Sequence, residues 1–447
     1  MATDQPRSNQ VGKCFWAPFL HFYQPPTQDV HVLKEINETC YEPLFNMLLD
    51  NPDFRCTINI NTVLLDLLSD HGLNNAIDFL KELVAKNQVE IVGSGKFHPI
   101  LPLIPKQEVL HQIKMQEDDL ERTFPGWAKG GFFPPEMAIS PGIASLVAQE
   151  GYKWVISSGI ACPSEWAYDK IYQNSDGNMS LFFRDDVISN EISFKKISVE
   201  FFIEKLKILY KTPHYIITAQ DGETFGHHVK HYENTFLKQA MQMAVEDDDI
   251  ELVLISDLPR HFKVASKVRP TASSWSTSQG DLDYNTPFPL WNHPDNPVHR
   301  VQFKFLKNVF ELVYMLEGYN AGIESRNPRI QEAITARYFL DRGLHSCQFW
   351  WASARPMWSP NLILKGAELL LRAAFNARLG IIDNFQQKNM IAESEECFDQ
   401  VSQYYSLLLQ EITKMEQAIV GKRAAQESLF ESLFSTEKDS TRGASKQ

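Results

Sequence analysis

The chain has 447 residues, of which 43% are apolar and 22% charged, a composition typical of a globular protein with a large core. This length allows one large domain with an appendage, or two domains. The 43 basic and 56 acidic side chains give a net charge of −13, which argues against nucleic acid or an anionic membrane as a partner and suits a neutral substrate. The six cysteines are widely spaced and form no C-x-x-C pair, so we expect free thiols rather than a zinc ribbon or a disulfide framework.

Two features of the chain concern its location. Residues 1–13 are polar and lack the apolar core of a secretory signal peptide. Apolar runs of about 18 residues, which a membrane-spanning helix needs, do not occur in the sequence. Together with the expected free thiols, these features predict a cytoplasmic protein.

Short apolar segments recur along the first part of the chain, and each is followed by a polar or glycine-bearing turn and then a helix-like stretch. The seven segments are 14–20, 55–60, 89–92, 130–133, 154–156, 215–219 and 252–255. Such alternation implies parallel strands joined by right-handed crossovers, and most simply a closed barrel. We therefore predict an α/β fold, with a (β/α)7 barrel in residues 1–297.

The rest of the chain changes character. Residues 271–297 are rich in Ser, Pro, Asn and Trp, which indicates a long loop near the rim of the barrel. A helical pattern then predicts a domain over 298–434 that closes the site, followed by a disordered tail over 435–447. Within the last helix an apolar stripe indicates packing against other helices or pairing with a second chain; it consists of Val401, Tyr405, Leu408, Ile412, Met415 and Ile419.

Polar side chains follow the predicted strands, and in a parallel barrel the strand ends meet at one rim. The set holds carboxylates, amides, hydroxyls, imidazoles and aromatic rings, which are groups that bind sugar hydroxyls and stack on sugar faces. It predicts a site for a polyol. The rim residues are His21, Gln24, Asn59, Asn61, Ser94, Phe97, His98, Glu136, Ser157, Asp221, Glu223 and Asp257.

Two rim carboxylates come from different strands: Glu136 in FFPPEM, and Asp221 in the run HYIITAQDGETFGHH. Cleavage of a glycosidic bond needs such a pair, because one carboxylate attacks the anomeric carbon and the other protonates the leaving oxygen. The structural alternatives are that Glu136 begins a helix, where the macrodipole favours an acid, and that Asp221 belongs to a turn that ends a strand.

These motifs resemble those of glycoside hydrolase family 57, whose enzymes hydrolyse or transfer α-glucans. Four regions match in order: HFYQP at 21–25 (usually His-Gln-Pro, here with two residues inserted), QVEIV at 88–92, FPPE at 133–136 and QDGE at 220–223. The resemblance implies a seven-stranded barrel followed by helices and a retaining enzyme of α-amylase or 4-α-glucanotransferase type. Glu136 would be the nucleophile and Asp221 the acid/base, with no cofactor and no metal. Hydrolysis and transfer both stay open.

The fifth family region is the least similar, because CQFWW at 347–351 carries Gln348 where an Asp is expected. Trp275 in SSWS resembles a tryptophan that lies over substrate in the family's branching enzymes. Trp350 and Trp351 either line a sugar subsite or form a buried aromatic cluster. The full set of candidate sugar-binding residues is His21, Gln24, Glu90, His98, Glu223, His227, Trp275, Trp291, Trp350 and Trp351.

Two other functions remain as alternatives. A metal-dependent polysaccharide deacetylase needs two histidines one helical turn apart, a spacing that His227 and His231 have. Such enzymes use a pair of aspartates after the first strand, however, where this chain carries His21. A non-catalytic glucan-binding protein is disfavoured because both Glu136 and Asp221 are present.

Overall fold

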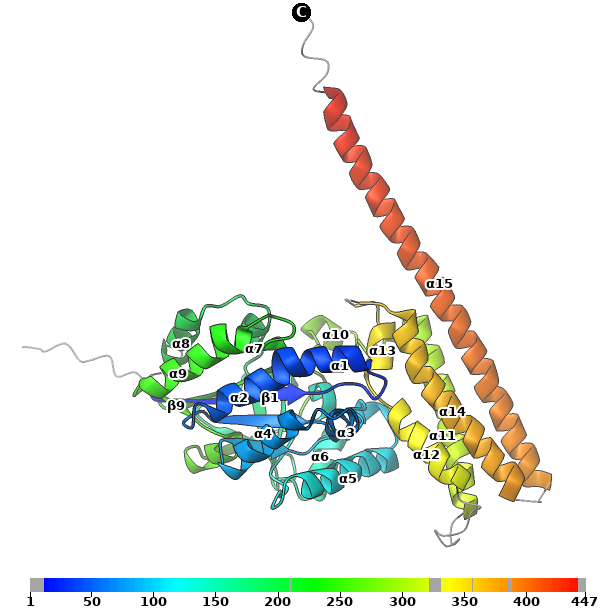
Figure 1. Ribbon diagram of the computed structural model, residues 1–447, viewed down its shortest axis with the longest axis horizontal. Helices are drawn as coiled ribbons and strands as arrows, with labels where there is room; N and C mark the ends of the chain where they lie inside the picture. The colour runs from blue at the N-terminus through cyan, green and yellow to red at the C-terminus, as the bar shows by residue number, and fades with distance from the viewer. Residues whose placement is uncertain (1–11, 209–210, 321–330, 356, 385–387, 441–447) are drawn as a thin grey trace, which may run out of the picture. The chain divides into compact units, whose positions relative to one another are not determined.

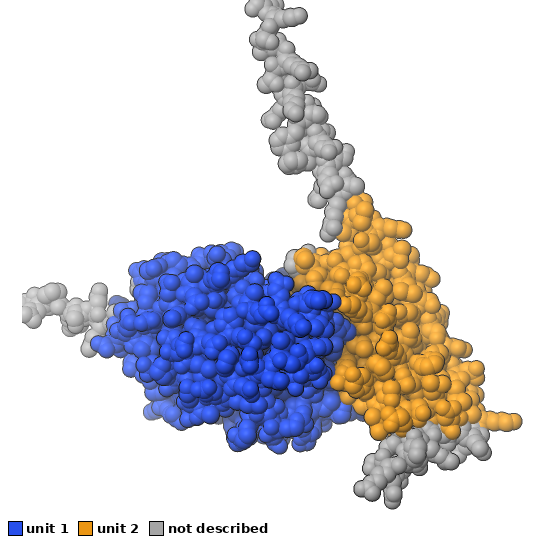
Figure 2. Space-filling view, in the orientation of Figure 1, with its two compact units in different colours: residues 1–289, 344–346 blue, residues 290–343, 347–447 orange. Residues whose placement is uncertain are grey.

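The computed structural model describes residues 12–208, 211–320, 331–355, 357–384 and 388–440. Two compact units emerge, Met1–Pro289 with Leu344–Ser346, and Leu290–Gly343 with Cys347–Gln447 (Figure 2). The boundary expected at 297–298 falls inside unit 2. The return of the short segment Leu344–Ser346 to unit 1 was not expected from the sequence.

Among the described residues, seven parallel strands form the ring of unit 1: β1 (Cys14–Phe22), β2 (Cys56–Ile60), β3 (Val89–Val92), β4 (Gly131–Phe132), β5 (Trp154–Ser158), β7 (Ser180–Arg184) and β8 (His214–Asp221). They pair in the orders β3-β2-β1-β8 and β4-β5-β7. A parallel bridge between Gly93 and Phe132 joins these two ladders at one side. At the other side the Asp185 backbone N–H donates to the Ile217 carbonyl at 2.9 Å. The ring is therefore closed, which confirms the predicted (β/α)7 barrel.

One expected strand is wrong and another was missed. Segment 252–255 overlaps β9 (Ile250–Leu252), which pairs only with the start of β1, at Cys14–Trp16. One edge of β1 is occupied by β8 from Cys14 to His21. The other edge pairs with β9 at its start and with β2 from Phe19 to Phe22. The missing member of the ring is β7. Two short strands, β6 (Ile171–Gln173) and β10 (Val264–Lys267), extend the sheet beside β7.

The helices of unit 1 lie outside the strands (Figure 1). They are α1 (Val30–Ile36), α2 (Glu42–Leu49), α3 (Thr62–Asp70), α4 (Asn74–Ala85), α5 (Lys106–Thr123), α6 (Pro141–Gln149), α7 (Asp186–Ser193), α8 (Val199–Ile208), α9 (Gln239–Glu246) and α10 (Gln279–Asp283). Between helices and strands, and inside the barrel, the core is apolar. Phe19, Phe182 and Ile217 are fully buried in the interior, and each stabilises the fold by about 1.5–3 kcal/mol.

Unit 2 is helical, as predicted, with α11 (Pro297–Asn320), α12 (Gln331–Gly343), α13 (Cys347–Ala352), α14 (Pro360–Asn384) and α15 (Lys388–Ser440). In α15 the stripe residues Val401, Leu408 and Ile412 are buried, and α15 packs against α11 and α14. The stripe thus packs within the chain. The expected disordered tail begins inside α15, while residues 441–447 lie outside the described part.

Two expectations about the whole chain can be compared with the structure. None of the described helices is long and apolar enough to cross a membrane. All six cysteines are free, and four of them are buried, as the absence of paired spacing predicted.

Candidate active site

Several of the predicted rim residues lie at the C-terminal ends of the strands. Asp257 does not, because the neighbouring Ser256 Oγ accepts a hydrogen bond from the indole N–H of Trp154, the first residue of β5. His21 near the end of β1 lies opposite Asn59 of β2 on one side and Asp221, the last residue of β8, on the other. Glu136 follows β4 in a single turn at Pro135–Met137. The two candidate catalytic carboxylates therefore come from different strands and reach the same rim.

Glu136 is held in an unusual backbone conformation by a neighbouring loop. Its φ and ψ are 59° and 19°, in the left-handed region, which for a residue other than glycine costs about 1–3 kcal/mol. The Trp275 backbone N–H donates to the Glu136 carbonyl at 3.2 Å, and the Trp275 indole Nε1–H donates to Glu136 Oε2 at 2.8 Å. Ile139 and Ser273 form an antiparallel bridge beside them. Glu136 therefore does not begin a regular helix, and loop 271–277 fixes both its backbone and its carboxylate.

Both carboxyl groups have raised pKa values. Burial, followed by the charge of Asp221, raises the pKa of Glu136 to about 8, while the hydrogen bond from Trp275 lowers it. Burial also raises the pKa of Asp221 to about 6, opposed by the charge of Arg184. The charge of Glu136 is therefore not the main cause of the raised pKa of Asp221. Near neutral pH the pair holds about one proton, which favours Glu136.

Asp221 is nevertheless accessible to a ligand. Its side chain is exposed, although burial dominates its pKa shift. The carboxylate is exposed because it lines a cavity, while the protein groups around it still raise its pKa. Asp221 can contact a ligand in this cavity.

Glu223 points away from Asp221 although only one residue separates them. The strand ends at Asp221 and a tight turn begins at Gly222, so the two carboxylates diverge. Glu223 Oε1 accepts hydrogen bonds from the Tyr41 hydroxyl at 2.7 Å and from Gln24 Nε2 at 3.1 Å. Burial and the Asp221 charge raise its pKa to about 7, against those hydrogen bonds. Glu223 and Gln24 thus bind each other and Tyr41, and their predicted contacts with sugar stay predictions.

The Gly222 turn depends on a close approach that only glycine permits. A Cβ atom at Gly222 would lie 2.0 Å from the ring of Phe22. Phe22 is one of the two residues inserted in the first motif, and its ring also packs against Tyr41 and Phe45. The first and fourth motifs are thus packed directly on each other.

Two predicted histidines form a buried hydrogen-bonded chain. His21 Nδ1 lies 2.7 Å from Asn59 Oδ1, His21 Nε2 lies 3.1 Å from His98 Nε2, and His98 Nδ1 lies 2.8 Å from Ser346 Oγ. All three bonds form at once when both rings are neutral, with His98 donating to His21 and Ser346 donating to His98. Burial lowers the pKa of His21 to about 4 and that of His98 well below its ordinary value, which favours these neutral rings.

This chain of bonds gives every ring nitrogen of His21 and His98 a partner in the protein. The contacts of both histidines with sugar stay predictions. His98 Nδ1 lies 3.8 Å from Glu136 Oε1, too far for a hydrogen bond. The inserted Tyr23 stacks on His98 with ring centroids 3.9 Å apart, and His21 stacks on Phe133 at 4.5 Å. The two histidines are thus held by hydrogen bonds and ring stacking beside Glu136.

A cavity of about 510 Å³ opens beside Asp221. It is lined by Arg184, Asn190, Ser193, Phe194, Gln220, Asp221, Thr224, His228, Trp275 and Ser276. Asp221 and Trp275 were predicted as site residues. Arg184 ends β7 and Asn190, Ser193 and Phe194 follow it, so these four were missed together with the strand that was not recognised. At the end of the run HYIITAQDGETFGHH, His228 lines the cavity, whereas the predicted His227 does not.

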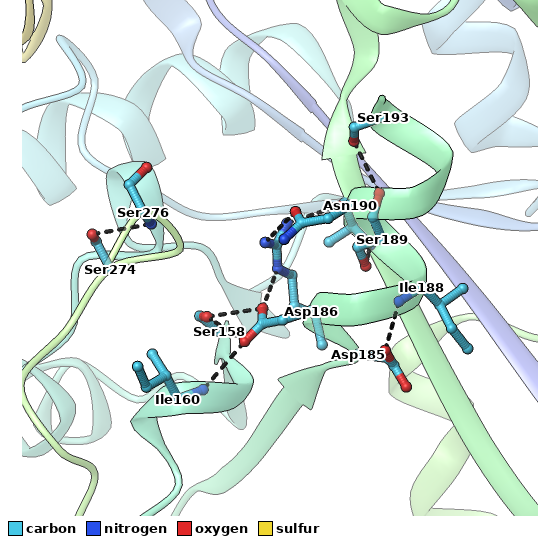
Figure 3. Close-up of polar contacts among 12 residues, drawn as sticks. Ser158, Ile160, Asp185, Asp186, Ile188, Ser189, Asn190, Ser193, Ser274 and Ser276 are labelled. Carbon is cyan, nitrogen blue, oxygen red and sulfur yellow. Dashed lines mark hydrogen bonds and ion pairs between the residues drawn. The ribbon is translucent and has the colours of Figure 1, made fainter. Parts of the chain in front are cut away.

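Arg184 is the most important of the missed residues. It is 4% exposed, and its guanidinium lies 5.4 Å from the Trp275 ring. Nε donates to Asp186 at 2.6 Å, Nη2 to Asn190 at 3.2 Å and Nη1 to the Ala219 carbonyl at 2.9 Å. Asp186 in turn accepts hydrogen bonds from Ser158 and Ile160 (Figure 3). A buried positive charge is therefore fixed between Asp221 and Trp275.

A model of glycosyl hydrolase family 57 matches residues 3–271, more than half of the 447 residues. The chain belongs to this family. An α-amylase of Pyrococcus horikoshii is 26% identical over 311 residues, which are 66% of this chain and 46% of that protein. A 4-α-glucanotransferase of Thermococcus litoralis is 24% identical over 278 residues, which are 59% of this chain and 41% of that protein. The chain therefore spans less than half the length of these two relatives.

Solved structures agree on the fold. A branching enzyme of family 57 from P. horikoshii superposes with a TM-score of 0.68 at 14% identity, covering 87% of this chain and 96% of that one. The crystal structure of the T. litoralis 4-α-glucanotransferase gives a TM-score of 0.62 at 20% identity, covering 81% of this chain and 60% of that one. At these identities the likeness supports the barrel and helical architecture of family 57.

Several predicted site residues are not among the described residues that line the cavity beside Asp221. Glu90 of the second motif lies two residues before the rim and binds Thr57 Oγ1 at 2.6 Å and the Ser256 N–H at 3.2 Å, which ties strands together. Trp291, Trp350 and Trp351 belong to unit 2. Trp291 is fully buried, and the other two form a T-shaped pair with centroids 4.8 Å apart. Their role in sugar binding stays a prediction.

The fifth region, with Gln348 in place of the expected Asp, lies in a short helix. Gln348 is buried in α13 of unit 2, where its Nε2 donates to the Gly343 carbonyl. A larger cavity of about 840 Å³ also lies in unit 2, beside Glu311, Glu393 and Glu396. Among the described residues that line it, neither Glu136 nor Asp221 occurs, so we assign the chemistry to the smaller cavity.

The geometry that a deacetylase requires is not formed. Residues 227–231 form turns instead of a helix, and His231 has a φ of 61°. His227 and His231 therefore do not share a helical face. Across the described part of the chain, no group of three or more His, Cys, Asp or Glu side chains is arranged to hold a metal ion.

Proposed function

We propose that this member of family 57 is a retaining enzyme that cleaves or transfers α-glucosidic bonds, with Glu136 as nucleophile and Asp221 as acid/base. One observation carries the proposal. Two carboxyl groups with raised pKa values stand at one barrel rim, where Trp275 holds one and the other opens onto a cavity. The α-amylase and 4-α-glucanotransferase names of the relatives support an α-glucan as the substrate.

In the first step Asp221 gives its proton to the glycosidic oxygen while Glu136 attacks the anomeric carbon, and the bond to the leaving sugar breaks. Trp275 occupies Oε2 of Glu136, which leaves Oε1 as the attacking atom. In the second step the Asp221 carboxylate takes a proton from water or from a sugar hydroxyl. The resulting oxygen nucleophile attacks the anomeric carbon, and the ester bond to Glu136 breaks.

The proton must move between the two carboxyl groups before the first step. In the free protein it favours Glu136, whose pKa of about 8 exceeds the value of about 6 for Asp221. A bound sugar displaces water from Asp221, which raises the pKa of that group further. Positive charge that develops on the sugar ring in turn favours ionised Glu136. Substrate binding therefore sets the protonation state that the mechanism needs.

The test is to incubate the protein with maltooligosaccharides of defined length and resolve the product lengths. Shorter products alone indicate hydrolysis, whereas longer and shorter products together indicate transfer. Glu136→Gln should retain less than about 1% of the activity, since a lost nucleophile costs several orders of magnitude. Unchanged oligosaccharides with the wild-type protein, or normal turnover by Glu136→Gln, would refute the proposal.

A further inference from the structure

The cavity beside Asp221 lies on one side of the proposed catalytic pair. Among the described residues that line it, Asp221 is present and Glu136 is not. An acid/base touches the leaving oxygen, whereas a nucleophile reaches the opposite face of the anomeric carbon. In the proposed mechanism, the leaving sugar therefore departs through this cavity, which contacts Asp221 but not Glu136. The group that attacks the glycosyl-enzyme enters through the same cavity.

The wall of this cavity has the chemistry of a sugar site. Asn190, Ser193 and Phe194 stand at the end of α7, and Ser276 lies on the facing loop, with Ser274 next to it (Figure 3). Hydroxyl and amide groups suit the hydroxyls of a sugar, and an aromatic face suits its C–H groups. The wall thus offers both kinds of contact at once.

Two groups in the wall are not accounted for by packing within the protein. Phe194 is 66% exposed, although a large apolar side chain gains free energy by burial. Gln220 is 3% exposed, and its buried amide nitrogen has no hydrogen-bond partner among the described residues. Leaving a buried donor unpaired costs about 1–3 kcal/mol. A ligand in the cavity would cover the Phe194 ring and could accept a hydrogen bond from Gln220.

The wall is also fixed relative to Asp221. The Ala219 N–H, two residues before Asp221, donates to Ser189 Oγ of α7 at 3.1 Å. Arg184 donates to the Ala219 carbonyl at 2.9 Å. Asp185 caps α7 by accepting from the Ile188 N–H at 2.8 Å. A hydroxyl bound on this wall would therefore be held in a constant position toward Asp221, which favours reaction with it over reaction with water.

We propose that this wall is an acceptor subsite for a glucosyl unit, with Phe194 as its aromatic platform, and that it directs the glycosyl-enzyme toward transfer. The inference rests on the proposed function. Asp221 takes the proton of the acceptor hydroxyl, whose oxygen attacks the anomeric carbon while the ester bond to Glu136 breaks. The product is a longer glucan and a free enzyme.

The test uses a glycosyl fluoride donor with maltose as acceptor, because fluoride leaves without occupying the acceptor subsite. The ratio of transfer product to hydrolysis product is measured at rising maltose concentration. Phe194→Ala should lower this ratio at least tenfold, and Phe194→Trp should restore most of it. Phe201→Ala is the matched control, because Phe201 does not line the cavity and is 52% exposed. Its surroundings are also similar: a lysine ammonium lies 5.4 Å from the Phe201 ring and another lies 5.6 Å from the Phe194 ring.

The outcomes separate the two proposals. An equal ratio in Phe194→Ala and the wild type overturns the acceptor subsite while leaving the proposed function intact. If the donor is never turned over, the proposed function fails, and maltose binding is then followed by tryptophan fluorescence. A dissociation constant raised at least tenfold in Phe194→Ala but not in Phe201→Ala would keep the sugar site. Equal binding by both variants, or no binding, overturns it.

Discussion

Trp275 makes two hydrogen bonds to Glu136, from its indole Nε1–H to Oε2 at 2.8 Å and from its backbone N–H to the carbonyl at 3.2 Å. Residues 139 positions apart are thereby locked together. The indole bond favours the carboxylate and lowers its pKa, whereas burial raises it. Trp275 thus favours the ionised form of Glu136, which the proposed role as nucleophile requires.

The first prediction concerns this bond. Trp275→Phe keeps an aromatic ring but removes the N–H, so the apparent pKa of the carboxyl pair should rise and the acidic limb of the pH profile of kcat/KM should move to higher pH. A hydrogen bond to a charged group contributes about 1.5–3 kcal/mol, so kcat/KM should fall roughly 10- to 100-fold. Trp127→Phe is the control, because Trp127 donates to the Ile91 carbonyl at 2.9 Å away from the site. An unmoved acidic limb would contradict the assignment.

The second prediction concerns stability. The pKa of Glu136 is raised from 4.5 to about 8 by burial and then by Asp221. A carboxyl with a higher pKa in the folded state stabilises the fold below its unfolded pKa, and this stabilisation is lost as pH rises through the folded pKa. Since Gln cannot ionise, Glu136→Gln should match the wild-type protein near pH 4.5 and exceed its free energy of unfolding above pH 8, by on the order of 1 kcal/mol or more.

Calorimetric melting at those two pH values measures this difference. Glu82→Gln serves as the control, because Glu82 is exposed and paired with Lys86 on the surface. The same pH dependence in wild type and Glu136→Gln would mean that Glu136 is not desolvated in the folded protein.

The sequence predicted the barrel, and the position of Glu136 and Asp221 at its rim, because both depend on local signals. Buried parallel strands are apolar runs, and the residues that follow them reach the rim whatever the helices between them do. This logic placed Glu136 and Asp221 correctly at one rim. The same logic missed β7. Its run ends in Arg184 and is followed by two aspartates, and such a density of charge is typical of a segment at the surface. A charge at a strand end can instead be buried when Asp186 and Asn190 bind it.

The roles of the histidines could not be predicted for a different reason. A sequence identifies an imidazole but not the partners of its two nitrogens. The partner of His98 is Ser346, 248 residues away, in a segment of three residues that joins unit 1. In the same way the partners of Glu223 could not be predicted, because Tyr41 and Gln24 lie 182 and 199 positions away in the sequence.

The third prediction concerns metals. The proposed chemistry uses carboxyl groups alone, and across the described residues no cluster of three or more potential metal ligands exists. Treatment with a chelator, followed by its removal, should therefore leave the rate of maltooligosaccharide conversion unchanged. Activity that is lost to the chelator and restored by zinc would instead favour the metal-dependent class of enzyme.

The last prediction separates Asp221 from Glu223. Asp221 opens onto the cavity, whereas Glu223 is 5% exposed and bound by Tyr41 and Gln24. Asp221→Asn should therefore lose the basic limb of the pH profile, because that limb reports loss of the proton that the leaving oxygen needs. It should suffer least with glycosyl fluorides, whose leaving group needs no proton.

Glu223→Gln should keep the basic limb and chiefly weaken binding, since an amide in place of the carboxylate disturbs the hydrogen bonds to Tyr41 and Gln24 that support the first motif. The pH profiles of kcat/KM for both variants, measured with a maltooligosaccharide and with a glycosyl fluoride, distinguish the two roles. If Glu223→Gln loses the limb and Asp221→Asn keeps it, the acid/base is Glu223. Its hydrogen bonds to Tyr41 and Gln24 would then have to break when substrate binds.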